Sequence, residues 1–114
     1  MKNEPISVAK AKKAISDYKK AIGRPEGLAE LSVFYCEEVF IFLDSCGMDD
    51  ESYFMALVRM FEQALKLVFV LPLAERTTYL ERLDKLRSRG KNIGWGVKED
   101  FDCLWFEAGL GVED

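Results

Sequence analysis

The sequence predicts an all-α protein, built as a single-domain antiparallel bundle of four long helices and one short C-terminal helix. Three observations lead to this fold class. Apolar residues recur every three or four positions through most of the chain, which is the period of a helix. Glycine or proline separates the periodic segments, where these residues commonly end or begin helices. The connections are also short, and short connections make neighbouring helices antiparallel.

The stretch from Tyr53 to Leu71 predicts the helix around which the others pack. Fifteen of its nineteen residues are apolar. At about 100° per residue its apolar arc spans roughly 200°, whereas a surface helix needs little more than about 100°. The charged residues within the stretch oppose a membrane-spanning role. We therefore expect this helix to be the most buried, starting near Asp49, Asp50 and Glu51 and ending at Pro72.

Two helices are predicted in the N-terminal half. The first starts at the capping residue Ser7, runs to Ile22 and carries its lysines opposite its apolar face, and Gly23 ends it. The second is expected from Pro25 to Cys46. Acidic residues seven apart form a stripe on the side opposite its apolar arc: Glu30, Glu37 and Asp44.

The C-terminal half predicts one long and one short helix. The long one begins at Pro72 or Leu73 and ends at Arg89, and Gly90 is expected in the left-handed cap position. The short one runs from Val97 to Ala108 and ends at Gly109.

Length and charge limit the possible organisation. A chain of 114 residues fits one domain, in which we expect residues 1–6 and 110–114 to be flexible. Sixteen basic and twenty acidic residues give a net charge of -4. This charge balance opposes nucleic-acid binding as the main activity.

The cellular compartment is expected to be the cytoplasm. No apolar run follows Lys2, so no secretory signal is predicted, and no later segment has the pattern of a membrane span. Cys36 and Cys46 lie ten residues apart on one predicted helix, about 15 Å, which is too far for a disulfide. With Cys103 they are expected to be reduced, buried thiols.

Large apolar side chains break the acidic stripe of the second helix. Phe34 and Ile41 project between charged residues, one heptad apart, and could contact a partner helix. The alternative is that the first helix covers them and brings its lysines to the acidic stripe. Trp95 is a third interface candidate, because it lies in a loop and would pack on the core or on a partner.

Catalytic chemistry has little support in the sequence. The chain contains no histidine, which removes the commonest general base and the usual zinc ligand. No catalytic, cofactor-binding or metal-binding residues are predicted. Carboxylates could still divide acid and base roles, but only if two buried acids faced each other in a pocket.

One region has the composition of an anion site. The segment from Gly90 to Gly96, GKNIGWG, could expose backbone amides, although its spacing fits neither the dinucleotide fingerprint nor the P-loop, and Glu99 and Asp100 follow it. The structural alternative is that its glycines serve turns and a helix cap. Basic residues precede and enter this loop and form the anion-binding candidates: Arg82, Lys85, Arg87, Arg89 and Lys91.

These observations favour a non-enzymatic helical interaction or regulatory module. We expect it to form a homodimer, or to dock on a larger protein, through Phe34 and Ile41. Binding of an anion or nucleic acid at Arg82 to Lys91 is the alternative function. An enzyme with a carboxylate-lined pocket is the third.

Overall fold

The computed structural model describes residues 6–46, 51–93 and 96–110. These ranges contain five α-helices and one short 3-10 helix, and no strand occurs in them. The all-α prediction is therefore confirmed. In chain order the elements are α1 (Ile6–Ala21), α2 (Pro25–Cys46), α3 (Glu51–Val68), α4 (Leu73–Arg89), η1 (Gly90–Asn92) and α5 (Val97–Glu107).

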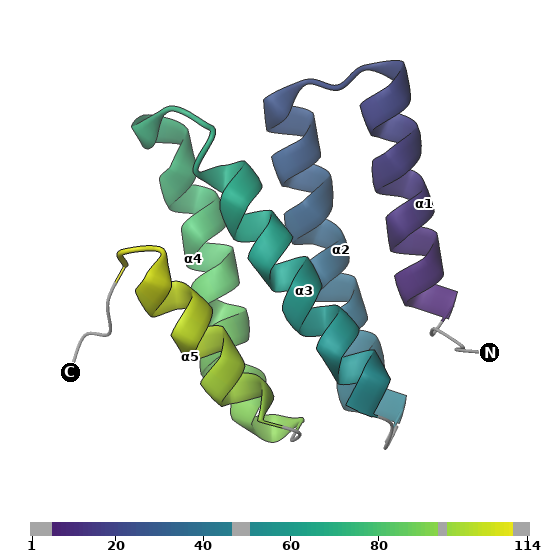
Figure 1. The fold of residues 1–114 in the computed structure, drawn as a ribbon, viewed down its shortest axis with the longest axis vertical. Helices are drawn as coiled ribbons and strands as arrows, with labels where there is room; N and C mark the ends of the chain where they lie inside the picture. Colours follow the sequence, from purple (N-terminus) through teal and green to yellow (C-terminus); the bar gives the residue numbers. More distant parts are fainter. Residues whose placement is uncertain (1–5, 47–50, 94–95, 111–114) are drawn as a thin grey trace.

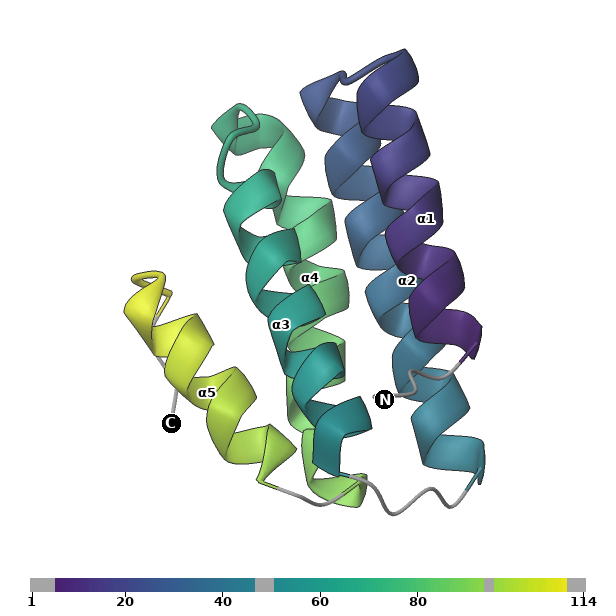
Figure 2. The ribbon, with the colours of Figure 1, turned by 45° about the vertical axis from the view of Figure 1, so that its right-hand side comes forward.

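The α-helices run alternately in opposite directions and form a flat bundle (Figure 1). Its principal extents are 41 × 38 × 20 Å, so its shortest dimension equals about two helix diameters. Turning the molecule shows α1 lying along α2, and α5 at the opposite edge beside α3 and α4 (Figure 2). The antiparallel arrangement follows the short connections that the sequence predicts.

The core is centred on α3, which packs against α2, α4 and α5. Leu57, Phe61 and Val68 are completely buried. The rings of Phe61 and Phe101 stack with their centroids 4.2 Å apart, and this contact joins α5 to α3. The expectation that the central stretch packs on more than one side is confirmed, but one flank of α3 stays open toward α1.

The C-terminus of α3 differs from the prediction. The helix ends at Val68, three residues before Leu71. The Val70 and Leu71 amides bond to carbonyls only three residues back, and this tighter turn carries Leu71 into the core. Arg76 of α4 donates to the Phe69 and Leu71 carbonyl oxygens, at 3.1 and 2.9 Å. Arg76 thus binds backbone oxygens at the end of this turn.

Glycine ends two helices as predicted but has a different role after α4. Gly23 and Gly109 have φ of +72° and +84°, in the left-handed region that favours glycine. Gly90 instead keeps right-handed helical geometry and continues into η1. A Cβ there would lie 3.2 Å from both Lys98 Cα and the Phe101 ring. Gly90 therefore allows the close approach of α5 and does not form a left-handed turn.

Candidate binding surfaces

The outer face of α2 retains exposed apolar side chains. Phe34 and Ile41 are 41% and 52% exposed. The alternative interpretation, in which the first helix covers them, is therefore wrong. Tyr18 of α1 lies over Gly27, seven residues before Phe34, but the N-terminal part of α1 leans into the core, where Val8 is completely buried. Val8 and Ala11 of α1 are thus buried elsewhere, and Phe34 and Ile41 remain accessible.

Two acids of the α2 stripe, Glu30 and Glu37, pair with residues of α4. Arg82 donates two hydrogen bonds to Glu37, at 3.1 and 2.7 Å, and a longer one of 3.4 Å to Glu30. The Tyr79 hydroxyl also donates to Glu30, at 3.0 Å. The bond to Glu37 is the main cause that raises the pKa of Arg82. These contacts join the second and fourth helices along one edge.

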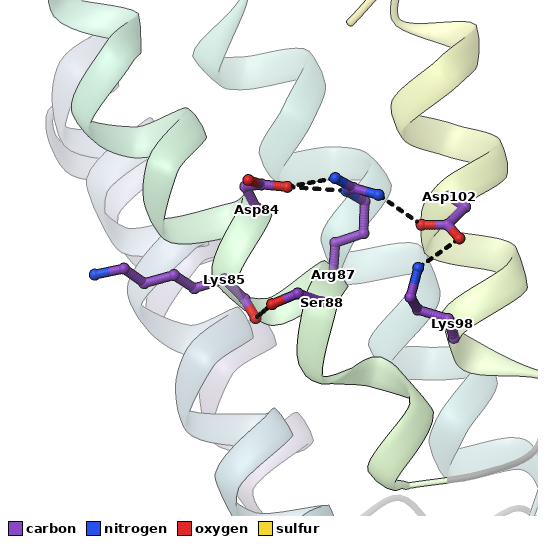
Figure 3. A network of polar contacts seen from close by, with 6 residues as sticks. All are labelled: Asp84, Lys85, Arg87, Ser88, Lys98 and Asp102. Atoms are coloured by element: carbon purple, nitrogen blue, oxygen red, sulfur yellow. Dashed lines mark hydrogen bonds and ion pairs between the residues drawn. The ribbon is translucent and has the colours of Figure 1, made fainter. Parts of the chain in front are cut away.

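A second polar network joins α4 to α5 (Figure 3). Arg87 donates to Asp84 on its own helix, at 3.0 and 2.7 Å, and to Asp102 on α5, at 2.9 Å. Lys98 donates to the other oxygen of Asp102, at 2.6 Å. The Arg87 guanidinium also lies 5.0 Å from the centre of the Trp105 ring, and only 14% of its side chain is exposed. Arg87 therefore serves as an internal link between helices.

The five anion-binding candidates do not form one cluster. Arg82 and Arg87 are engaged by carboxylates, and Lys85 extends away from the Arg87 network (Figure 3). The Arg89 guanidinium lies 5.5 Å from the centre of the Phe40 ring. Lys91 is exposed. Pairing neutralises two of the five positive charges, which weakens the attraction of this region for phosphate.

The glycine-rich loop is described only in part. Gly96 has a φ of +70° and precedes α5, so the expected turn conformation is confirmed there. Glu99 and Asp100 occupy the first turn of that helix. Their negative charges lie at the positive, N-terminal end of the helix dipole, which would otherwise attract an anion. Trp95 and Gly94 lie outside the described residues.

A groove between α1 and α3 was not located by sequence reasoning. It has a volume of about 700 Å³, and α2 contributes its floor. The floor includes Ser32, only 3% exposed and the one buried polar residue in the described part of the chain. Charged side chains line both walls: Lys12 and Lys19 on α1, Arg59 and Glu51 on α3. The groove exists because α1 packs on α2 and leaves one flank of α3 uncovered.

The wide apolar arc of the central helix was the sequence signal for such a surface. An apolar arc of roughly 200° is wider than the stripe with which a helix contacts a single neighbouring surface. The uncovered part includes Met55, which is 38% exposed, and the half-buried Ala56 and Met60. Among the described residues that line the groove, only Glu51 carries a carboxylate. The described lining residues therefore do not include the facing pair of buried acids that a carboxylate-based enzyme requires.

The described cysteines differ in exposure. Cys36 is buried, as expected, and burial raises the pKa of its thiol well above the ordinary value. Cys103 is exposed, so the expectation that it is buried is wrong. It lies on the outer side of α5, whereas Phe101 and Trp105 point into the core. No group of three or more metal-ligating side chains occurs in the described ranges.

None of the helices within the described ranges has the length and apolar composition needed to cross a membrane. Comparison of the chain with protein-family models, curated proteins and solved structures finds no match.

Proposed function

We propose that this chain is a non-enzymatic helical interaction module that self-associates through the outer face of α2. The observation that supports this proposal is the exposure of Phe34 and Ile41 on one side of a helix whose Val33, Phe40 and Leu43 side chains are buried in the core. Two large apolar residues one heptad apart suit packing against another helix. A second copy of the same face would cover them in a two-fold dimer.

The charge around these residues determines how the dimer responds to salt. Helix α2 contains five acidic residues and no basic one. Glu38 and Asp44 are exposed, and a two-fold contact would bring like charges of the two copies together. Added salt screens such repulsion. Self-association through α2 should therefore strengthen as ionic strength rises.

Light scattering behind a sizing column, over a series of protein concentrations, tests this proposal. We expect a dimer that dissociates on dilution and becomes a monomer in the double variant Phe34→Ser, Ile41→Ser. Phe106→Ser is the control, because Phe106 is 67% exposed on α5, away from the proposed contact. A protein that stays monomeric at every concentration contradicts self-association, and a dimer that survives the double variant contradicts its location.

Anion or nucleic-acid binding remains the alternative function, and its candidate residues are Lys85, Arg89 and Lys91 together with the paired Arg82 and Arg87. The carboxylates bound to both arginines disfavour it. Binding of a single-stranded oligonucleotide that weakens steeply with salt would support this alternative.

A further inference from the structure

The groove between α1 and α3 has the length of a helix. Its α3 wall extends from Glu51 to Leu67, which is about 24 Å of helix at about 1.5 Å per residue. An occupant of about sixteen helical residues would match that length. Helical partners commonly place one apolar face in a groove of this kind. The α1–α3 groove is therefore a surface distinct from the Phe34 and Ile41 face of α2.

The interior of the groove suits apolar anchors. Met55, Ala56 and Met60 contribute to one wall, and Leu28 to the floor. Methionine is unbranched and polarisable, so it adapts its shape to different apolar side chains. Ser32 contributes one hydroxyl to this floor, and Ser32 is only 3% exposed. An occupant would therefore need an apolar stripe with little polar character.

The walls of the groove determine the charge that the occupant should carry. Of the described residues that line the groove, Lys12 and Lys19 lie on one side and Arg59 on the other, and Glu51 is the only acid among them. The α1 wall belongs to a helix with five lysines and one aspartate. Carboxylates on both flanks of a bound helix would face these cations. A phosphate backbone fits less well, because the interior is apolar and the floor helix carries five acidic residues.

We propose that the α1–α3 groove binds an acidic amphipathic helix of a partner protein. The apolar stripe of this helix lies against Met55 and Met60, and its flanking carboxylates lie beside Lys19 and Arg59. This proposal does not depend on self-association through α2. The two also differ in their response to salt, because attraction between opposite charges weakens as salt is added.

A pair of synthetic peptides tests the groove. The first is an eighteen-residue helix, a length chosen to span about 24 Å, with leucine at positions i, i+3, i+4 and i+7 and glutamate on both flanks. The second replaces every glutamate with lysine. Fluorescence polarisation with the full chain should show binding of the acidic peptide that weakens with salt, and at least roughly tenfold weaker binding of the basic peptide. Equal binding of the two peptides, or no binding of the acidic one, would overturn the proposal.

Matched variants locate the contact. Lys19→Glu should weaken binding of the acidic peptide by roughly threefold to tenfold. Lys20→Glu makes the same charge change on the neighbouring residue, which does not line the groove, and should have little effect. Ala56→Trp should block the groove, and thermal melting checks that this variant remains folded. An equal loss in the Lys19 and Lys20 variants, or full binding by folded Ala56→Trp protein, places the peptide elsewhere and rejects the groove.

A competing oligonucleotide distinguishes the partner class. A single-stranded DNA oligomer should not displace the acidic peptide. If DNA binds instead of the peptide, and Lys19→Glu removes that binding, the basic residues of the groove bind phosphate groups and the proposal is wrong. The test of peptide binding is independent of the test of self-association, because the double variant Phe34→Ser, Ile41→Ser should leave peptide binding unchanged.

Discussion

Arg82 Nη2 lies 2.7 Å from Glu37 Oε1, and Arg82 Nε lies 3.1 Å from Glu37 Oε2, so one guanidinium holds both oxygens of one carboxylate. The two residues are 45 positions apart in the chain. About a quarter of each side chain is exposed. Such a bidentate pair fixes both the distance and the orientation between α2 and α4.

Removing one partner of this pair should destabilise the protein. Arg82→Ala leaves the Glu37 carboxylate partly buried without its donors, and should lower the free energy of unfolding by about 1–3 kcal/mol. Arg82→Lys should recover only part of this loss, because lysine cannot make the same two parallel bonds. Urea denaturation measures both effects.

The strength of the Arg82–Glu37 contact itself follows from a double-mutant cycle. We expect a coupling of about 1 kcal/mol or more between Arg82→Ala and Glu37→Ala. The exposed pair Lys13 and Asp17, 3.1 Å apart on α1, is the control and should show little coupling. Equal coupling in the two cycles would mean that the pair contributes no more than a surface contact.

Acid should weaken the link between α4 and α5. Burial acts to raise the pKa of Asp102, but hydrogen bonds from Lys98 and Arg87 outweigh it and hold the pKa below its ordinary value. Because the pKa of Asp102 is lower in the folded than in the unfolded protein, its carboxylate stabilises the fold above the unfolded pKa of about 3.9. This stabilisation is lost as the pH falls through the folded pKa.

The variant Asp102→Asn tests this pH dependence. At neutral pH it should be less stable than the wild-type protein, and the difference should shrink below about pH 4. Unfolding in urea at a series of pH values measures it, with Asp17→Asn as the exposed control. A stability difference that stays constant down to strongly acidic pH would show that the Asp102 charge contributes nothing.

The two described thiols should react at different rates. Thiolate is the reactive form, and burial disfavours it at Cys36. Iodoacetamide at neutral pH should modify the exposed Cys103 quickly and Cys36 only after unfolding. Peptide mapping by mass spectrometry, with a urea-unfolded sample as the control, measures both rates. Modification of Cys36 as fast as Cys103 in the folded protein would contradict its burial.

The attachment of α1 depends on a glycine in α2. A Cβ at Gly27 would overlap the ring and hydroxyl of Tyr18. Gly27→Ala should therefore displace Tyr18 and destabilise the α1–α2 contact, although alanine favours a helix by up to about 1 kcal/mol over glycine. In a Tyr18→Ala background the clash is removed, and the same substitution should become stabilising. Thermal or urea unfolding of the wild-type protein, the two single variants and the double variant measures whether Gly27→Ala raises or lowers stability in each background. Destabilisation in both backgrounds would contradict the steric explanation.

Local pattern was sufficient to predict the five α-helices of this protein, although not the short 3-10 helix η1. The three- and four-residue spacing of apolar side chains predicts each α-helix, and Gly23 and Gly109 end two of them as expected. The apolar arc of the central stretch also predicts the burial of Leu57 and Phe61. These properties depend on the helical period and on the backbone preferences of glycine and proline, which are expressed within a few residues.

Only the tertiary structure decided how the helices face one another. Periodicity predicts that α1 has an apolar side. Whether this side covers Phe34 or packs into the core depends on how each helix is rotated and on how it crosses its neighbours. The same rotations bring Arg82 to Glu37 and bring α5 close to Gly90. They also leave one flank of α3 open as a groove. Packing among residues far apart in the chain sets these rotations, and the period of a single helix does not contain that information.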